Sequence, residues 1–256
     1  MSVEAPLSRV TILVPPGDAA PTRALLLELA PGGFEECVTQ DGVELAAYGD
    51  EGLAARVVAA FPAARVTPVA PGWENAWRAF HRPVVVGGIW IGPPWEVAPV
   101  GMPSVTIDPG QAFGTGAHAT TRLCVELLAM LRPAGLLDIG CGSGVLALAA
   151  ARLGFAPLVG VDDDPVAIEA ATANAAANGI ALTAFVCDAR RDPLPSAPVA
   201  VVNILLPAVE AVLPRLSVET AVTSGYLAHE QPSVPGWRPA ERRTLDGWAA
   251  DVFVRA

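Results

Sequence analysis

A glycine-rich turn with an acidic residue on either side is the stretch of this sequence best suited to binding a small molecule. Gly140, Gly142 and Gly144 alternate with other residues directly after an apolar run. Glycine lets a backbone turn tightly and leaves no side chain between the backbone and a ligand. Asp138 precedes the first glycine by two positions, and Asp162 follows the next apolar run. We expect Asp162 to accept hydrogen bonds from both hydroxyls of a ribose.

The spacing of these glycines separates two classes of nucleoside cofactor. A dinucleotide-binding fingerprint reads GxGxxG, which would require a third glycine where this chain has Val145. The carboxylate of Asp138 would also repel a pyrophosphate, whereas it suits a cofactor with a positively charged end. The pattern Asp-x-Gly-x-Gly-x-Gly at 138–144 resembles the first motif of class I methyltransferases, which bind S-adenosylmethionine. A tight strand-to-helix turn without a ligand is the alternative, and the two flanking acids argue against it.

Alternating strands and helices must hold these residues at one edge of a sheet. The expected strands are 135–139, 158–161, 184–187, 199–202, 221–223, 242–245 and 251–255, and the expected helices are 120–131, 145–153, 165–178 and 207–216. Such alternation predicts an α/β fold with a Rossmann-like seven-stranded sheet, in which ligands bind at the carboxyl ends of the strands. Asp188 follows the third strand, where it can reach the edge of an adenine, and Asn203 follows the fourth.

Residues 1–70 read as a separate small domain. Strands are expected at 9–14, 33–39, 42–48 and 65–69, and helices at 18–29 and 51–61. The order β-α-β-β-α-β predicts a ferredoxin-like α+β fold. This segment carries nine acidic residues and four arginines, a net charge of −5, and no catalytic constellation. We therefore expect it to recognise a substrate, with packing or dimerisation as the alternative.

Two further segments complete the predicted organisation. Residues 71–100 form a linker with four of the six tryptophans, which we expect to anchor it. Residues 101–256 form the domain that contains the glycine-rich turn. Its first part, 105–122, is a glycine-broken loop that runs into a helix and can fold over one end of a bound cofactor. His118 lies in this loop and, considered alone, would be a structural residue.

Length and composition exclude several classes of protein. With 256 residues, 52% of them hydrophobic and only 16% charged, the chain can bury a core in one large domain or in one domain plus a small one. No apolar run approaches the length of about 18 residues that a membrane span needs. The start of the chain also lacks the basic and apolar regions of a secretory signal. We therefore expect a cytoplasmic protein that makes no contact with a membrane.

The cysteines and the charge restrict the ligands further. Four scattered cysteines without a CxxC pair, and only three histidines, indicate neither a disulfide framework nor a metal site. The formal net charge is −10, and all 16 basic residues are arginines. An acidic surface disfavours direct binding to nucleic acid and favours a basic protein partner.

Four segments together resemble one family of class I methyltransferases, the PrmA family, whose members methylate ribosomal protein L11 of bacteria. They are DPGQAFGTGAHATTR (108–122), LLDIGCGSGVLALAA (136–150), VGVDDDP (159–165) and VVNILL (201–206). The resemblance covers the whole chain and implies a ferredoxin-like substrate domain, a tryptophan-bearing linker and a C-terminal methyltransferase domain. Carried over by position, the family's contacts to S-adenosylmethionine fall on Thr121, Gly140, Asp162 and Asn203, with Phe113 near the cofactor.

Two features depart from the family's pattern. No LxPGG-like turn precedes the strand expected at 221–223, where the chain reads LSVETAVTSGYL. The N-terminal domain matches in the order of its elements more than in its residues. The sequence therefore supports methyltransferase chemistry more firmly than it supports one protein substrate.

The resemblance implies methyl transfer to an amino group of a protein, either a lysine side chain or an N-terminal α-amine. That amine must be neutral, and removing a proton from lysine at pH 7 costs about 4.6 kcal/mol because its ordinary pKa is about 10.4. We predict that the side-chain carbonyl of Asn203 orients the lone pair of the amine and that His118 relays a proton. These are the two predicted catalytic residues.

Other functions on the same fold stay open at this stage. The protein substrate could differ, as in related protein-lysine methyltransferases, or the substrate could be a small molecule or an RNA. RNA would require a basic face, which the net charge of −10 disfavours. A catalytically silent cofactor-binding protein is the remaining alternative, and the intact set of Asp138, Asp162 and Asn203 argues against it.

Overall fold

The computed structural model describes residues 8–30, 34–39, 41–69, 81–108 and 116–256. These residues belong to two compact units, Met1–Phe80 and His81–Ala256, each with its own core. Among the residues that the structure describes, no helix combines the length and the apolar character needed to cross a bilayer.

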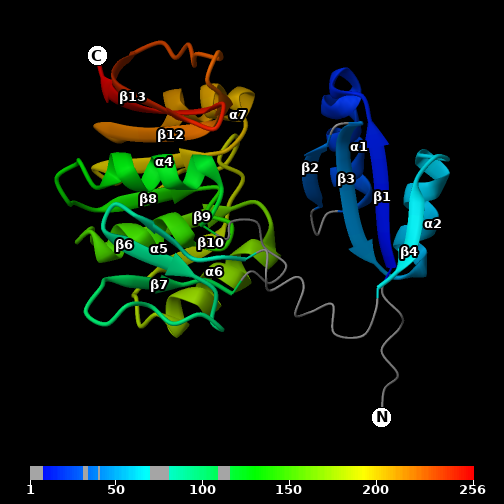
Figure 1. Ribbon diagram of the computed structural model, residues 1–256. Coiled ribbons are helices and arrows are strands. Elements are labelled where there is room, and N and C mark those ends of the chain that lie inside the picture. The colour runs from blue at the N-terminus through cyan, green and yellow to red at the C-terminus, as the bar shows by residue number, and fades with distance from the viewer. Residues whose placement is uncertain (1–7, 31–33, 40, 70–80, 109–115) are drawn as a thin grey trace. The chain divides into compact units, whose positions relative to one another are not determined.

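The smaller unit is a four-stranded antiparallel sheet with two helices (Figure 1). Its elements are β1 (Ser8–Val14), the short 3-10 helix η1 (Pro16–Asp18), α1 (Ala19–Leu29), β2 (Glu35–Thr39), β3 (Gly42–Gly49), α2 (Glu51–Ala60) and β4 (Arg65–Pro68). The strand order β2-β3-β1-β4 confirms the ferredoxin-like prediction. Val10, Leu45 and Val57 are fully buried in its core, because alternate residues of β1 and β3 point toward the helices.

The larger unit is built on a seven-stranded sheet in the order β10-β9-β8-β11-β12-β14-β13 (Figure 1). The strands are β8 (Leu136–Ile139), β9 (Leu158–Asp162), β10 (Thr183–Val186), β11 (Val199–Asn203), β12 (Thr220–Leu227), β13 (Trp237–Leu245) and β14 (Trp248–Arg255). All are parallel except β14, which pairs antiparallel with β12 and β13. This arrangement confirms the predicted Rossmann-like sheet.

Two apolar cores cover the two faces of this sheet. The helices are α4 (Ala119–Leu128), α5 (Val145–Arg152), α6 (Pro165–Ala177) and α7 (Leu206–Val212), and the 3-10 helix η2 (Leu213–Arg215) follows α7. One core joins α4, α5 and α6 to Leu136 and Val201, and the other joins α7 to Leu137 and Val202. Because successive strand residues point to opposite faces, α7 lies across the sheet from the other three helices.

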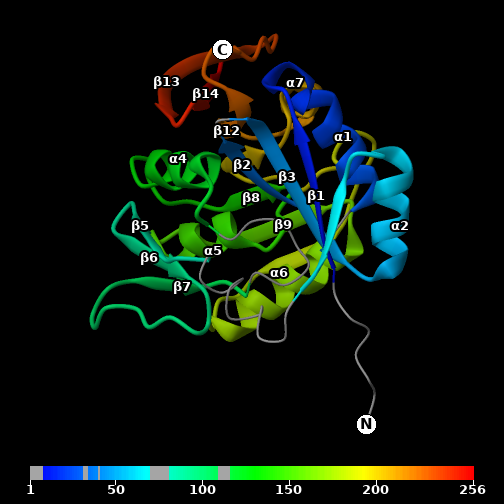
Figure 2. The same ribbon diagram turned by 45° about the vertical axis from the view of Figure 1, so that its right-hand side comes forward.

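The stretch predicted as a linker differs from the prediction after residue 80. Residues 81–100 belong to the larger unit, where β5 (Val84–Val86), β6 (Ile89–Gly92) and β7 (Ser104–Thr106) form a small sheet against α4 and α5 (Figure 2). The side chain of Trp90 is buried there, with only 4% of the residue exposed. Gly87 and Gly88, with φ of 58° and 78°, form the turn between β5 and β6. Trp73 and Trp77 lie outside the described residues.

The last three strands are longer than predicted. Asp246 and Gly247 have φ of 50° and 81° and form a two-residue turn, so β13 and β14 pair along their full length as a hairpin. The expected helix at 207–216 instead divides into α7 and η2, and Pro214 lies in η2. Residues 228–236 join β12 to β13 without a helix, and Val234 and Trp237 fill the core beside α7.

Candidate functional site

The glycine-rich turn lies at the carboxyl ends of β8 and β9 and is held by backbone bonds. The N–H groups of Gly140 and Cys141 donate to the carbonyl of Val161, at 2.8 and 3.0 Å. Gly140, Gly142 and Gly144 have φ of 68°, 52° and 81°, a region that other residues rarely adopt. The turn therefore has the conformation for which its glycines were predicted to be needed.

Asp138 is a buried carboxylate with one oxygen left over. Its Oδ2 accepts a hydrogen bond from the N–H of Ala147 at 3.0 Å, whereas Oδ1 is buried and has no hydrogen-bond partner among the described residues. Burial raises the pKa of Asp138 to about 7, and the nearby charge of Asp162 adds to this shift, while the bond from Ala147 opposes it. A buried acceptor without a partner is costly, so this oxygen suits a cationic or hydrogen-bond-donating ligand.

Asp162 ties the glycine-rich turn to the next strand. Its Oδ2 accepts from the N–H of Gly142 at 2.9 Å and its Oδ1 from the N–H of Asp164 at 3.1 Å. An ionised carboxylate offers about four lone-pair sites, so two sites stay available for hydroxyl groups of a ligand. Burial raises the pKa of Asp162 above its ordinary value, and the two backbone bonds oppose the shift.

A cleft of about 220 Å³ opens beside this carboxylate. It is lined by Ile139, Gly140, Asp162, Asp163, Cys187, Asp188, Ala189, Arg190, Ile204, Leu205, Ala208 and Val212. The predicted residues Gly140, Asp162 and Asp188 thus meet around one space. Apolar side chains on β8, α7 and the turn after β11 form the walls, and the acids lie at the ends of β9 and β10. Such a slot fits a flat aromatic base joined to a hydroxylated sugar.

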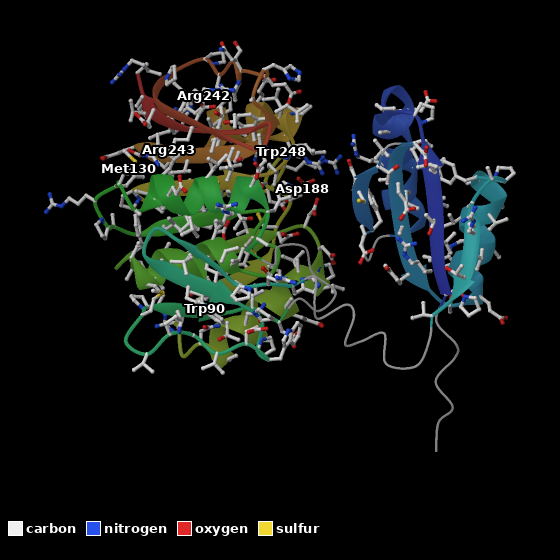
Figure 3. The ribbon with its side chains drawn as sticks, in the orientation of Figure 1. Trp90, Met130, Asp188, Arg242, Arg243 and Trp248 are labelled. Carbon is white, nitrogen blue, oxygen red and sulfur yellow. The ribbon has the colours of Figure 1, made fainter. Side chains whose placement is uncertain are left out.

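Asp188 is held in place by the turn that follows it. Its Oδ1 accepts from the backbone N–H and the Nε of Arg190, at 2.9 and 3.1 Å, and these bonds lower its pKa. Its own N–H donates to Asp192 at 2.9 Å. The carboxylate lies at the same edge of the larger unit as Trp248 (Figure 3). Because its pKa is lowered, the Asp188 carboxylate stays ionised, as an acceptor for an exocyclic amine should.

Asn203 ends β11 on the face of the sheet that Asp138 also faces. In β11 and β8 the side chains of Val201 and Leu136 point to the core formed with α4 and α5, and alternation gives Asn203 and Asp138 the same direction. Thr121, in the first turn of α4, is 2% exposed. Phe113 lies outside the described residues, so its predicted place near the cofactor stays a prediction.

His118 is the N-cap of α4. Its Nδ1 lies 2.8 Å from the Thr120 hydroxyl and accepts from the Thr120 N–H at 3.3 Å, which requires this nitrogen to be unprotonated. The ring also meets Trp248 edge-on, with 4.9 Å between centroids. Burial lowers the pKa of His118 below 6.5. These contacts support a positioning role at the start of α4 for the residue that the sequence suggested as a proton relay.

Sequence reasoning missed two residues at this edge. Ile204 lines the cleft, and Trp248 packs against His118. Trp248 follows the Asp246–Gly247 turn, a dipeptide typical of hairpins. A hairpin predicted from this dipeptide would have placed Trp248 beside the carboxyl end of β12. Nothing in the sequence marks Ile204, because one isoleucine after an apolar strand resembles any other core residue.

The chain is similar to proteins of one family. The family model described as ribosomal protein L11 methyltransferase (PrmA) matches residues 64–236. A ribosomal protein L11 methyltransferase of Symbiobacterium thermophilum is 37% identical over 199 residues, which cover 72% of this chain and 66% of that protein. One from Myxococcus xanthus is 42% identical over 132 residues, or 48% of this chain and 46% of that protein. The matched part thus spans between about half and two thirds of these relatives.

A solved structure agrees with this similarity. The ribosomal protein L11 methylase of Lactobacillus delbrueckii subsp. bulgaricus superposes with a TM-score of 0.61 at 27% identity. The superposition covers 68% of this chain and 98% of that one.

Proposed function

The chain belongs to the ribosomal protein L11 methyltransferase (PrmA) family, and from this premise we propose that it is an S-adenosylmethionine-dependent enzyme that methylates amino groups of ribosomal protein L11. The observation that carries the proposal is the cleft lined by Gly140 of the glycine-rich turn, Asp162 and Asp188, together with the buried Oδ1 of Asp138, which has no hydrogen-bond partner among the described residues. The target amines are lysine side chains, the N-terminal α-amine, or both.

The residues present fit this cofactor. Asp162 would hold the ribose hydroxyls, Asp188 the adenine amine, and the apolar wall with Ile139 and Ile204 the base. Asp138 would offset the positive charge of the methionine end, directly or through the turn, and Thr121 and Asn203 would complete the contacts. When bound, S-adenosylmethionine supplies an electrophilic methyl group on its sulfonium.

The remaining catalytic task is to present a neutral amine in line with that methyl group. Asn203 has a neutral carbonyl acceptor at the carboxyl end of β11, which can orient the amine without favouring its protonated form. Holding reactants in the correct orientation can supply about 7–11 kcal/mol of the barrier reduction. His118 and its contact with Trp248 fix the start of α4 and so the end of the 105–118 loop.

We assign recognition of the protein substrate to the smaller unit. Residues 1–70 carry a net charge of −5, which suits a basic partner such as a ribosomal protein. A ribosomal substrate also implies that the reaction takes place in the cytoplasm. No direct contact of the enzyme with nucleic acid is required.

One experiment tests the proposal against its competitors. The protein is incubated with S-adenosylmethionine labelled in its methyl group and with total ribosomal proteins that lack prior methylation. We expect label in a single protein band that mass spectrometry identifies as L11. Label in another protein would change the substrate, label only in small molecules or RNA would change the class of reaction, and no label despite cofactor binding would indicate a silent binding protein.

Replacing Asp162 with alanine should weaken cofactor binding at least about tenfold, because losing a charged hydrogen-bond acceptor costs about 1.5–3 kcal/mol. Calorimetric titration with S-adenosylhomocysteine measures the change. Glu169→Ala, on the exposed face of α6, removes the same charge from the same region and should leave the affinity unaltered. Equal affinities for the two folded variants would remove Asp162 from the site.

Cofactor binding should release protons near neutral pH. Burial raises the pKa of Asp138 to about 7 in the free protein, so a cationic ligand that favours the ionised form expels a proton from about half of the molecules at pH 7. Affinity should therefore rise between about pH 6 and pH 8. Calorimetry of S-adenosylmethionine binding in two buffers of different ionisation enthalpy reads the release directly. Equal heats in both buffers would contradict the role of Asp138, and Asp138→Asn should abolish the difference.

A further inference from the structure

A glycine in β12 and a glycine in the cofactor-binding turn hold one residue between them. A Cβ on Gly140 would lie 2.5 Å from Cγ2 of Ile204, and a Cβ on Gly225 would lie 2.6 Å from the carbonyl carbon of Ile204. The side chain of Ile204 therefore packs on the first glycine and its backbone on the second. Ile204 directly follows Asn203, so its position determines how β11 ends.

The close approach at Gly225 depends on a β-bulge. The pairing of β12 with β14 shifts between Ser224 and Tyr226, and Gly225, with φ of 100°, is the extra residue. On its other side β12 pairs with β11, and in that pairing Asn203 lies opposite Ser224. The bulge thus bends β12 beside the carboxyl end of β11, where Asn203 lies.

Buried polar groups fix the bulge on both sides. The Ser224 hydroxyl donates to the Ala249 carbonyl at 2.7 Å. The Tyr226 hydroxyl donates to Oδ2 of Asp251 at 2.8 Å and lies 2.7 Å from the Thr223 hydroxyl. Tyr226 and Asp251 are 1% and 2% exposed, so these bonds form in an environment without water. Such bonds are strong, and removing one partner is costly.

Arg242 links this set to the connection that follows β12. Its Nη1 donates to Asp251 at 3.2 Å, and its Nη2 donates to the carbonyls of Ala228 and Glu230 at 3.0 and 2.6 Å. Arg242 lies on β13 (Figure 3). The charge of Asp251 is therefore paired, and both ends of the bulged segment are tied to the hairpin of β13 and β14.

We propose that Gly225 and the set formed by the buried Tyr226 and Asp251 with the partly buried Arg242 are positioning residues for methyl transfer: they hold Ile204 against the cofactor-binding turn and thereby place Asn203. The inference rests on the proposed function for its catalytic readout. No residue of the set is required to touch substrate or cofactor. Their effect acts through the backbone at 203–204.

The test compares Gly225→Ala with Gly236→Ala. Both glycines have positive φ, of 100° and 79°, but no atom of the described residues lies within 4 Å of a Cβ placed on Gly236, at the opposite end of the sheet. Gly225→Ala should lower kcat on ribosomal protein L11 about a hundredfold, the cost of displacing a catalytic group by about 1 Å. Its Kd for S-adenosylhomocysteine should rise about tenfold because the cleft is no longer preorganised. Its KM for L11 should stay unaltered, and Gly236→Ala should change none of the three.

Tyr226→Phe is the second variant, for the case that Gly225→Ala does not fold. It keeps the ring and removes only the hydroxyl, and Tyr48→Phe, at the other tyrosine of the chain, is its control for cofactor affinity. We expect a lower kcat and a higher cofactor Kd for Tyr226→Phe, with KM for L11 unaltered. A folded Gly225→Ala that matches Gly236→Ala in kcat and Kd, or a folded Tyr226→Phe that matches the parent protein in both, would overturn the inference. If the parent protein binds cofactor but does not methylate L11, the proposed substrate fails, and the Kd comparison alone decides whether the inference stands.

Discussion

Replacing Asn203 with aspartate should lower the rate of methyl transfer to ribosomal protein L11 by about ten- to a thousandfold at neutral pH. An opposite charge close to an amine raises the pKa of that amine by about 1–3 units, and each unit removes nine tenths of the neutral, reactive form. Asparagine has the same shape and a neutral carbonyl, so we expect it to align the amine without this cost. Because the pKa of the amine is raised, the rate should recover in part at high pH, where the amine loses its proton even beside a carboxylate.

Steady-state rates of the parent protein and two variants between about pH 6 and pH 10 measure this effect. Asn203→Asp should shift the rise in rate to higher pH. Cys141→Ala is the control: this thiol is in the glycine-rich turn, but burial raises its pKa and keeps it protonated, so its loss should change the rate little. An Asn203→Asp enzyme as active as its parent at pH 7, or an inactive Cys141→Ala enzyme that still binds cofactor, would show that the mechanism is wrong.

Removing residues 1–80 should abolish methylation of L11 and leave cofactor binding intact. The larger unit begins at His81 and contains both apolar cores that cover its sheet, and every residue that lines the cleft belongs to it. The smaller unit supplies the acidic surface that we assign to recognition of the basic substrate. The shortened protein should therefore bind S-adenosylhomocysteine with the Kd of the full chain.

Two measurements on the shortened protein distinguish recognition from packing. Calorimetry establishes that the cleft is intact, and a methylation assay with L11 follows. Methylation at the full rate would mean that the smaller unit is not a recognition module. Loss of cofactor binding would mean instead that it supports the fold of the larger unit.

Several residues that line the cleft could be predicted because they lie next to strand ends. Gly140 follows the strand that contains Asp138, Asp162 ends the next strand, and parallel strands bring such positions to one edge. The structure places Gly140, Asp162 and Asp188 around the cleft as this reasoning requires. It could not be foreseen that Oδ1 of Asp138 has no hydrogen-bond partner in the described part of the chain, since this depends on which backbone N–H groups of α5 come within reach.

The parts that sequence reasoning missed depend on pairing between distant segments. Gly87 and Gly88 between two apolar runs are a typical hairpin signal, but without its partner β7 the short β5–β6 hairpin reads as a linker. In the edge strand β13 four consecutive residues, from Arg238 to Glu241, are exposed. Its sequence therefore lacks the alternation of buried and exposed residues that would have revealed its length. A glycine inside a strand indicates a bulge, yet only the fold shows that Gly225 meets the backbone of Ile204.

The intact mass of purified ribosomal protein L11 tests the central claim most directly. L11 without prior modification is incubated with this protein and S-adenosylmethionine, and the same reaction is run with Asp162→Ala. We expect the mass of L11 to rise in steps of one methyl group with the parent protein, and at limiting cofactor we expect the variant to give little or no increase. An unchanged mass of L11, in a reaction where the parent protein demonstrably binds S-adenosylmethionine, would contradict the central claim.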